Sequence, residues 1–109
     1  MVEMVPIPVG DRWAMGVTVE LPRTRLVVAA VPSGYIMCGA LDVELLDRLL
    51  GHRQIVAGRA LGVRSLQDLL RQPLESVTAA AAALGLEPGM TGEAALALLL
   101  QVTPPNPTA

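Results

Sequence analysis

The chain has no phenylalanine and no lysine, and it carries one tryptophan, one tyrosine, one cysteine and one histidine. A single cysteine excludes a disulfide within the chain, which argues against a disulfide-stapled secreted domain and favours a reducing compartment. One cysteine and one histidine also cannot supply the ligands of a typical structural zinc site. We therefore expect a cytoplasmic protein without a metal or other cofactor.

Charged residues are scarce as well, at 17% of the chain against an apolar fraction of 52%. Soluble domains of ordinary composition carry about 25% charged residues. With so few polar side chains to cover the surface, we expect an apolar interface between subunits and hence a homo-oligomer. The alternative is that the composition simply reflects an Ala-, Leu- and Val-rich protein from a GC-rich genome.

Two classes of partner are not expected from this sequence. All eight basic residues are arginines and they are spread along the chain, so no basic block is present to neutralise the phosphates of a nucleic acid. The longest apolar runs, residues 26–31 and 94–100, are far shorter than the roughly 20 residues of a membrane helix. The N-terminus also lacks the charged and apolar regions of a signal peptide.

The hydrophobic pattern predicts an α+β domain over residues 1–101, with residues 102–109 as a proline-rich, disordered tail. Alternating and continuous apolar runs predict strands, and amphipathic runs with capping residues predict helices. The predicted strands are 2–9, 12–21, 26–31, 35–39 and 55–63, and the predicted helices are 41–50, 65–71, 73–84 and 91–101. The first strands form an antiparallel part, while 35–63 form a βαβ unit with parallel strands, which gives a mixed sheet followed by C-terminal helices.

Two details of this pattern bear on the fold. Pro6 and Pro8 place the first strand at an edge of the sheet, because proline cannot donate to a strand ladder. The alternation in the second strand puts its large apolar residues on one face, from Trp13 through Met15 and Val17 to Leu21.

The segment Gly34–Asp42 is the strongest candidate for a site, because a strand there leads into a helix. Cys38 lies at this junction, where a helix dipole would stabilise a thiolate and make it reactive. The competing interpretation is a packed cysteine, since free cysteines are among the most buried residues. The only histidine, His52, follows the helix and is expected at its far end, so it is a poor base for Cys38.

Further candidates surround this junction. Asp42 is expected to cap the helix, and its alternative role is a polar contact beside Cys38. Arg59 interrupts an apolar strand, so its guanidinium must meet a carboxylate, solvent or a ligand anion, because an unpaired buried charge is costly. Asp42 and Glu75 are the expected carboxylate partners. No base accompanies Ser76, and the glycines of residues 58–62 match neither a P-loop nor a dinucleotide fingerprint.

These segments resemble the YunC-like family, a group of small bacterial and archaeal proteins of unknown function. The resemblance is strongest in Gly34–Val43 and continues through 56–60 and 62–64, with weaker similarity in 73–78 and at 89–92, and it covers about residues 10–100. It implies a compact α+β fold and no established activity, so it assigns no catalytic residue.

The leading interpretation is a homo-oligomeric ligand-binding or accessory domain. Its pocket would be formed by Gly39, Asp42, Arg59 and Glu75 around Cys38, and it would take a small anionic ligand. The first alternative is a thiol-dependent enzyme or redox sensor with Cys38 as the catalytic residue. The second alternative is a purely structural interaction module.

Overall fold

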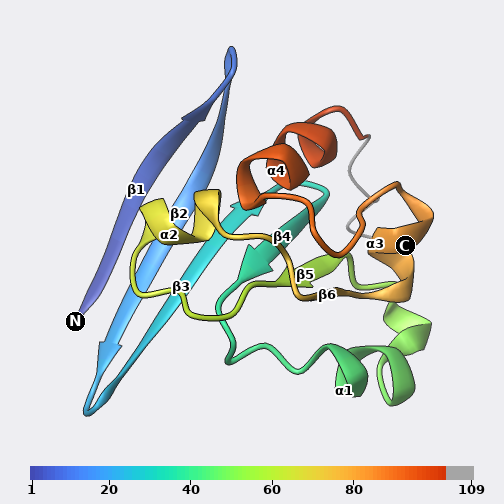
Figure 1. Ribbon diagram of the computed structural model, residues 1–109, viewed down its shortest axis with the longest axis horizontal. Coiled ribbons are helices and arrows are strands. Elements are labelled where there is room, and N and C mark those ends of the chain that lie inside the picture. The colour runs from blue at the N-terminus through green and yellow to red at the C-terminus, as the bar shows by residue number, and fades with distance from the viewer. Residues whose placement is uncertain (103–109) are drawn as a thin grey trace.

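The computed structural model describes residues 1–102 and arranges them as one six-stranded sheet with helices on both sides (Figure 1). The strands are β1 (Val2–Val9), β2 (Arg12–Leu21), β3 (Thr24–Val31), β4 (Gly34–Met37), β5 (Ala57–Arg59) and β6 (Ser76–Val77). The helices are α1 (Val43–Arg48), the 3-10 turn η1 (Gly51–Arg53), α2 (Leu66–Arg71), α3 (Ala79–Ala83) and α4 (Gly92–Leu100).

The strands lie side by side in chain order, from β1 at one edge to β6 at the other. Only β4 and β5 are parallel neighbours among these six strands, and α1 lies in the connection between them. Short turns join the first four strands as antiparallel hairpins; in the first, Gly10 has a φ of +62°, which suits a two-residue hairpin loop. The predicted α+β class, antiparallel start and βαβ unit are therefore confirmed.

The two prolines of β1 occupy the outer edge without breaking its pairing. The backbones of Met1 and Glu20 exchange hydrogen bonds, at 2.8 and 3.2 Å. Because hydrogen-bonded pairs alternate along an antiparallel ladder, Val5 and Ile7 also bond to β2, while the nitrogens of Pro6 and Pro8 face outward. The prolines thus fit the edge position predicted from them.

The main core lies on one face of the sheet, which we call the inner face. Helices α2 and α4 pack on it, and their leucines join Ile7, Val27 and Ile36 from the strands in the main core. Helix α1 lies on the opposite, outer face, where Val43 forms a smaller cluster with Tyr35 of β4 and Ala57 of β5. The smaller cluster covers the outer face only over β4 and β5.

The large apolar residues of β2 lie on the face of the strand that points away from the main core. Ala14 and Gly16 are buried on the inner face, while Trp13 and Met15 are 62% and 40% exposed on the outer face. In the middle of this strand the side chains of both faces are uncharged, since Ala14 and Gly16 alternate with Trp13 and Met15, so the pattern alone did not show which face meets the helices. The large apolar side chains of β2 therefore lie outside the core.

The helix predicted for residues 73–84 is wrong over its first part. Ser76 and Val77 instead form β6, and α3 begins at Ala79 after Thr78, whose hydroxyl caps it. Backbone hydrogen bonds to distant segments replace the local helical ones: the amides of Leu74 and Glu75 donate to carbonyl oxygens of other segments at 2.7 Å. Tertiary pairing here overrides helix propensity.

Two other predicted elements are shorter in the structure. The strand expected over 55–63 is regular only over Ala57–Arg59, and the helix expected over 41–50 extends over Val43–Arg48. In that helix Leu45 and Leu49 are 37% and 58% exposed. The tail expected at 102–109 lies outside the described residues except for Val102.

We predict that Gly92→Ala destabilises the protein by about 2 kcal/mol, because overpacking at a rigid contact forces the backbone to shift. A Cβ at Gly92 would lie 2.0 Å from the carbonyl oxygen of Leu69 and 2.8 Å from Cδ1 of Ile36. The midpoint of urea unfolding measures the change. Gly51→Ala is the matched control, since a Cβ there meets nothing within 4 Å. Equal midpoints for the two variants would contradict the close packing of α4 on α2.

Candidate functional site

A groove of about 600 Å³ lies between α1 and the paired strands β5 and β6. We call it the Arg59 groove. Its walls come from the start of α1 on one side and from the outer face of the sheet on the other. Its lining residues are Asp42, Val43, Glu44, Asp47, Arg48, Arg59, Glu75 and Ser76.

An ion pair between Arg59 and Glu75 forms the floor of this groove. The Nη2 of Arg59 donates to Oε1 and Oε2 of Glu75 at 2.9 and 3.1 Å, and Nε donates to Oε2 at 3.3 Å. The Nη1 donates to the carbonyl oxygen of Leu41 at 3.1 Å, which ties the strand to the segment before α1. The sequence predicted that the guanidinium of Arg59 needs a carboxylate, solvent or a ligand anion, and the carboxylate of Glu75 takes this place.

This pair shifts the protonation equilibria of both side chains. The hydrogen bonds from Arg59 hold the pKa of Glu75 below its ordinary value, and the same bonds raise the pKa of Arg59. The two side chains remain 27% and 38% exposed, so the pair is a partly solvated one rather than a buried one.

The acidic residues of α1 also have structural partners. Asp42 caps the helix, with Oδ1 accepting a hydrogen bond from the amide of Leu45 at 3.0 Å. The Oδ1 of Asp47 accepts one from the amide of Ala79 at 2.9 Å, which joins α1 to the start of α3. The capping role predicted for Asp42 is thus confirmed, and Asp47 connects two helices.

Ser76 is the one residue of the groove with a buried polar side-chain atom that makes no hydrogen bond. Its Oγ is buried and is the only such side-chain oxygen or nitrogen without a hydrogen bond in residues 1–102. It lies near enough to Glu75 to help lower that pKa, yet its geometry falls short of a hydrogen bond. The sequence showed no base beside Ser76, so Ser76 was not among the expected site residues. Its position opposite Arg59 depends on β6, a strand that the sequence did not predict.

The charge of the groove is negative on balance. Four carboxylates line it, against the two guanidinium groups of Arg48 and Arg59. Arg48 lies 4.0 Å from Glu44, and Arg59 is held by Glu75. A ligand entering the groove therefore meets arginines that already have acidic partners.

Cys38 and Gly39 lie outside the groove. Cys38 is 5% exposed in the main core on the inner face, and its Sγ accepts a hydrogen bond from the amide of Val27 at 3.4 Å. Gly39 is exposed, and a Cβ there would meet Leu61 at 3.2 Å. Of the five site residues expected from the sequence, the structure brings together Asp42, Arg59 and Glu75, and separates the other two from them.

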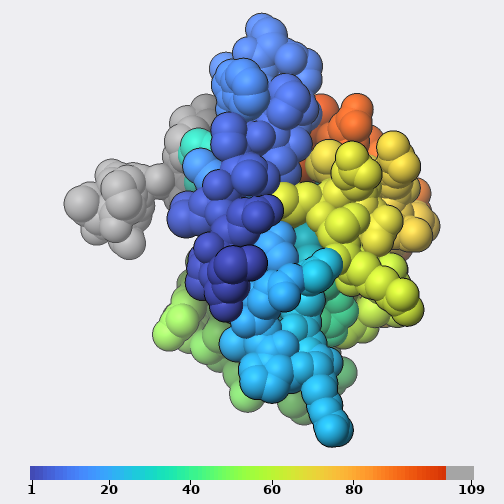
Figure 2. All heavy atoms as spheres, turned by 90° about the vertical axis from the view of Figure 1, so that its left-hand side faces the viewer, coloured from blue at the N-terminus to red at the C-terminus, as the bar shows by residue number. Residues whose placement is uncertain are grey.

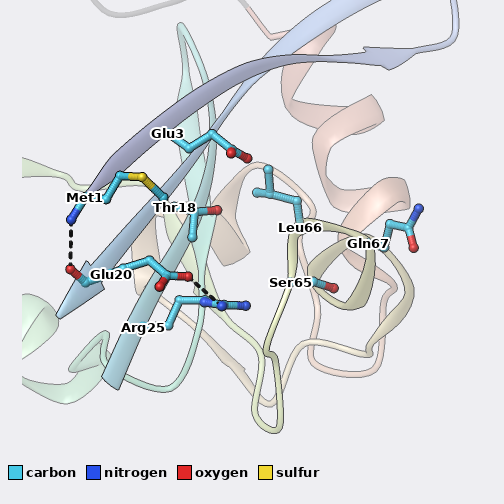
Figure 3. A pocket seen from close by; sticks show the side chains of 8 residues that line it. All are labelled: Met1, Glu3, Thr18, Glu20, Arg25, Ser65, Leu66 and Gln67. Carbon is cyan, nitrogen blue, oxygen red and sulfur yellow. Dashed lines mark hydrogen bonds and ion pairs between the residues drawn. The ribbon is translucent and has the colours of Figure 1, made fainter. Parts of the chain in front are cut away.

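A second hollow of about 350 Å³ lies between β2 and the start of α2 (Figure 3). Arg25 spans it, with an ion pair to Glu20 at 2.5 Å and a hydrogen bond from Nη1 to the carbonyl oxygen of Arg64 at 2.8 Å. Ser65 at its rim caps α2 by accepting from the amide of Asp68. These contacts hold α2 against the sheet. The charged side chains of Arg25 and Glu20 already have partners within the protein.

Neither a metal cluster nor a membrane-spanning helix is found in the part of the chain that the structure describes. No three His, Cys, Asp or Glu side chains among residues 1–102 come together as a metal site requires. No helix of those residues is long and apolar enough to cross a membrane.

Comparison with known proteins gives consistent relationships. Residues 37–99 match a family model described as a domain of unknown function, DUF1805. The uncharacterized protein YunC of Bacillus subtilis is 50% identical over 101 residues, which cover 93% of this chain and all of that protein.

A solved structure shares the fold. The crystal structure of a protein of unknown function, TA1206 from Thermoplasma acidophilum, superimposes with a TM-score of 0.80. The match covers 91% of this chain and 93% of that one, at 24% sequence identity. At this identity the likeness is one of fold alone.

We predict that the thiol of Cys38 reacts slowly in the folded protein. Burial removes the access that a reactive thiol needs, so unfolding in urea should raise the rate of labelling by about 100-fold or more. Labelling with a chromogenic disulfide at neutral pH measures this rate, and Cys38→Ala provides the blank because the chain has no other cysteine. Equal rates in buffer and in urea would show that the thiol is accessible.

We predict that Glu75→Gln lowers stability at neutral pH and that the loss disappears in acid. The unfolded pKa of a glutamate is about 4.3, and that of folded Glu75 lies lower. Its contribution is therefore complete above the unfolded pKa and is lost as the pH falls through the folded one. Urea midpoints at pH 7 and at lower pH measure the difference from the native protein.

Glu87→Gln is the control for this comparison. Glu87 is exposed and makes no ion pair with the described residues. The ion pair would contribute no stability of its own if the difference in urea midpoint between Glu75→Gln and the native protein did not depend on pH. The same conclusion would follow if Glu87→Gln showed the same pH dependence.

Proposed function

The chain belongs to the DUF1805 family, and we propose that it is a cytoplasmic, homo-oligomeric accessory domain that binds a small polar ligand in the Arg59 groove. One observation supports the ligand-binding part: Ser76, a residue that lines this groove, carries the only unpartnered buried polar side-chain atom of residues 1–102, its Oγ. A buried hydroxyl without a partner costs about 1–3 kcal/mol, so it is expected to be completed by a ligand.

Arg59 supplies a second free group beside Ser76. A guanidinium has five N–H donors. Arg59 makes four hydrogen bonds with them, to both carboxylate oxygens of Glu75 and to the carbonyl oxygen of Leu41. One hydrogen on Nη1 remains available. Ser76 and Arg59 therefore bring a hydroxyl and an N–H donor to a groove that four carboxylates also line.

This arrangement favours a ligand that brings hydrogen-bond donors or positive charge, which the carboxylates of Asp42, Glu44 and Asp47 would accept. A small anion, as expected from the sequence, is the second candidate because Arg59 faces the groove. Such an anion would have to compete with Glu75 for the guanidinium, in a site whose net charge is negative.

The other interpretations of the sequence receive less support. A thiol-dependent enzyme needs an exposed, low-pKa cysteine, whereas Cys38 is packed among core residues on the inner face. The single cysteine also supports the cytoplasmic assignment, since it leaves no disulfide within the chain. The homo-oligomeric part rests on the low charge content and on the apolar strand face described in the next subsection.

We predict that Ser76→Ala stabilises the free protein by about 1 kcal/mol and weakens ligand binding about fivefold, because it removes an unsatisfied hydroxyl that the ligand completes. Urea unfolding measures the stability. Ser33→Ala is the matched control: Ser33 is buried too, but its Oγ donates to the carbonyl oxygen of Leu99 at 2.6 Å. That variant should lose about 1 kcal/mol.

Binding is measured by amide NMR titration with two defined probes, 1,4-diaminobutane and inorganic phosphate. The diamine should shift the signals of residues 42–48 and 75–77, and Ser76→Ala should weaken that response while Ser33→Ala leaves it unchanged. Shifts in the same residues with phosphate instead would favour the anion. No response to either probe, together with a loss of stability in Ser76→Ala, would refute a ligand site in this groove.

A further inference from the structure

The outer face of the three N-terminal strands is apolar and uncovered. We call it the outer strand face and define it by Val2, Met4, Trp13, Met15, Val17 and Val28. The strand register aligns Met4, Val17 and Val28 across β1, β2 and β3, so these side chains form one continuous surface. Val2, Met4 and Trp13 are each 62% exposed, and none of the six side chains is charged.

No described helix lies over this face. Helices α2 and α4 contact β1, β2 and β3 from the inner face, and α1 contacts β5 at the other end of the sheet. In Figure 2 the β1–β2 hairpin stands along the front of the molecule, with α2 on one side and the region of α1 lower on the other. The largest contiguous apolar patch on a protein surface is often a contact surface.

The edge of β1 is a poor place for a partner to attach. Pro6 and Pro8 present no N–H groups along the outward side of this strand. Strand addition would therefore lack half of its ladder over that stretch. Association through these strands is directed to their face rather than to their edge.

The size of the face fits a reversible dimer. Eight-residue strands are about 26 Å long and three of them are about 14 Å wide, which gives roughly 370 Å² in projection. That matches the largest apolar patches on monomers, of about 300–600 Å², and is below the roughly 800 Å² that each partner buries in a standard interface. Contacts at this face should therefore dissociate on dilution.

We propose that two copies of the chain pack their outer strand faces together, sheet against sheet, around a two-fold axis. This inference rests on the oligomeric part of the proposed function and names its surface. A second copy fits because an uncharged apolar face is complementary to itself and leaves no buried charge when it is paired. Two sheets packed face to face bury their alternate side chains about 10 Å apart, as in β-sandwiches.

Light scattering of the full chain over a range of concentrations tests the proposal. The native protein should have twice the 11.4 kDa mass of one chain at high concentration and should approach that mass on dilution. Met15→Glu and Met4→Glu should both stay at the single-chain mass, because each buries a charge in the contact. Leu61→Glu is the matched control, since Leu61 is 50% exposed and lies outside the face.

Trp13, the only tryptophan, reports the contact directly. Its emission should move to longer wavelength as the native protein is diluted, and it should remain at the long wavelength in Met15→Glu at all concentrations. Far-UV circular dichroism and the urea midpoint check that each variant is folded. If Met15→Glu does not fold, Met4→Glu decides the test, because that side chain is more exposed.

Three outcomes would overturn the inference. A single-chain mass at every concentration would refute both the dimer and the oligomeric part of the proposed function, while the groove is tested separately by its probes. A dimer that both face variants leave intact would refute this surface alone. A single-chain mass that doubles when residues 103–109 are deleted would identify that segment as the occupant of the face.

Discussion

The small side chains on the inner face of β2 determine how the rest of the protein packs. A Cβ at Gly16 would lie 2.7 Å from the side chains of both Ile7 and Leu66, so β1 and α2 approach the strand as closely as its missing side chain allows. Because strand side chains alternate, this fixes Met15 and Val17 on the opposite face. The apolar surface on the outside of the molecule is thus a consequence of the close packing inside it.

A second set of contacts builds the groove on the other half of the sheet. Arg59 connects β5 to Glu75 and to the backbone of Leu41, and Asp47 connects α1 to α3. These polar contacts hold the helix over the strand pair at the position where Ser76 is left without a partner. A protein that was selected only for stability would replace such a hydroxyl with alanine, since an unmade hydrogen bond is costly and a surface ion pair contributes little.

Much of the fold could be predicted because its signals are local. Pro6 and Pro8 identified an edge strand, and Asp42 identified a helix start. The helices predicted from residues 65 and 91 begin where the side chains of Ser65 and Thr91 cap them. The strand, helix and strand around Gly34–Asp42 led to the parallel pair. The wrong helix over residues 73–84 came from the same local reasoning, applied where long-range backbone bonds of Leu74 and Glu75 decide the structure.

The candidate site was less accessible to sequence reasoning because its members meet only in three dimensions. Arg59 could be recognised because it interrupts an apolar strand. Its partner Glu75 was one of the two carboxylates expected, the other being Asp42. Cys38 and Gly39 were grouped with it by proximity in the chain, yet the cysteine side chain points to the opposite face of the sheet. The orientation of β2 was also open, since Ala14 and Gly16 on one side and Trp13 and Met15 on the other are all uncharged.

A second copy of the chain is the proposed cover of the apolar face that this packing produces. Oxidative footprinting of the full chain, read by mass spectrometry, tests it most directly because Met4 and Met15 lie on that face, while Met90 lies beside the main core. Oxidation of Met4 and Met15 should fall as the protein concentration rises, while that of Met90 should not change. Equal oxidation of Met4 and Met15 at all concentrations would contradict the proposal.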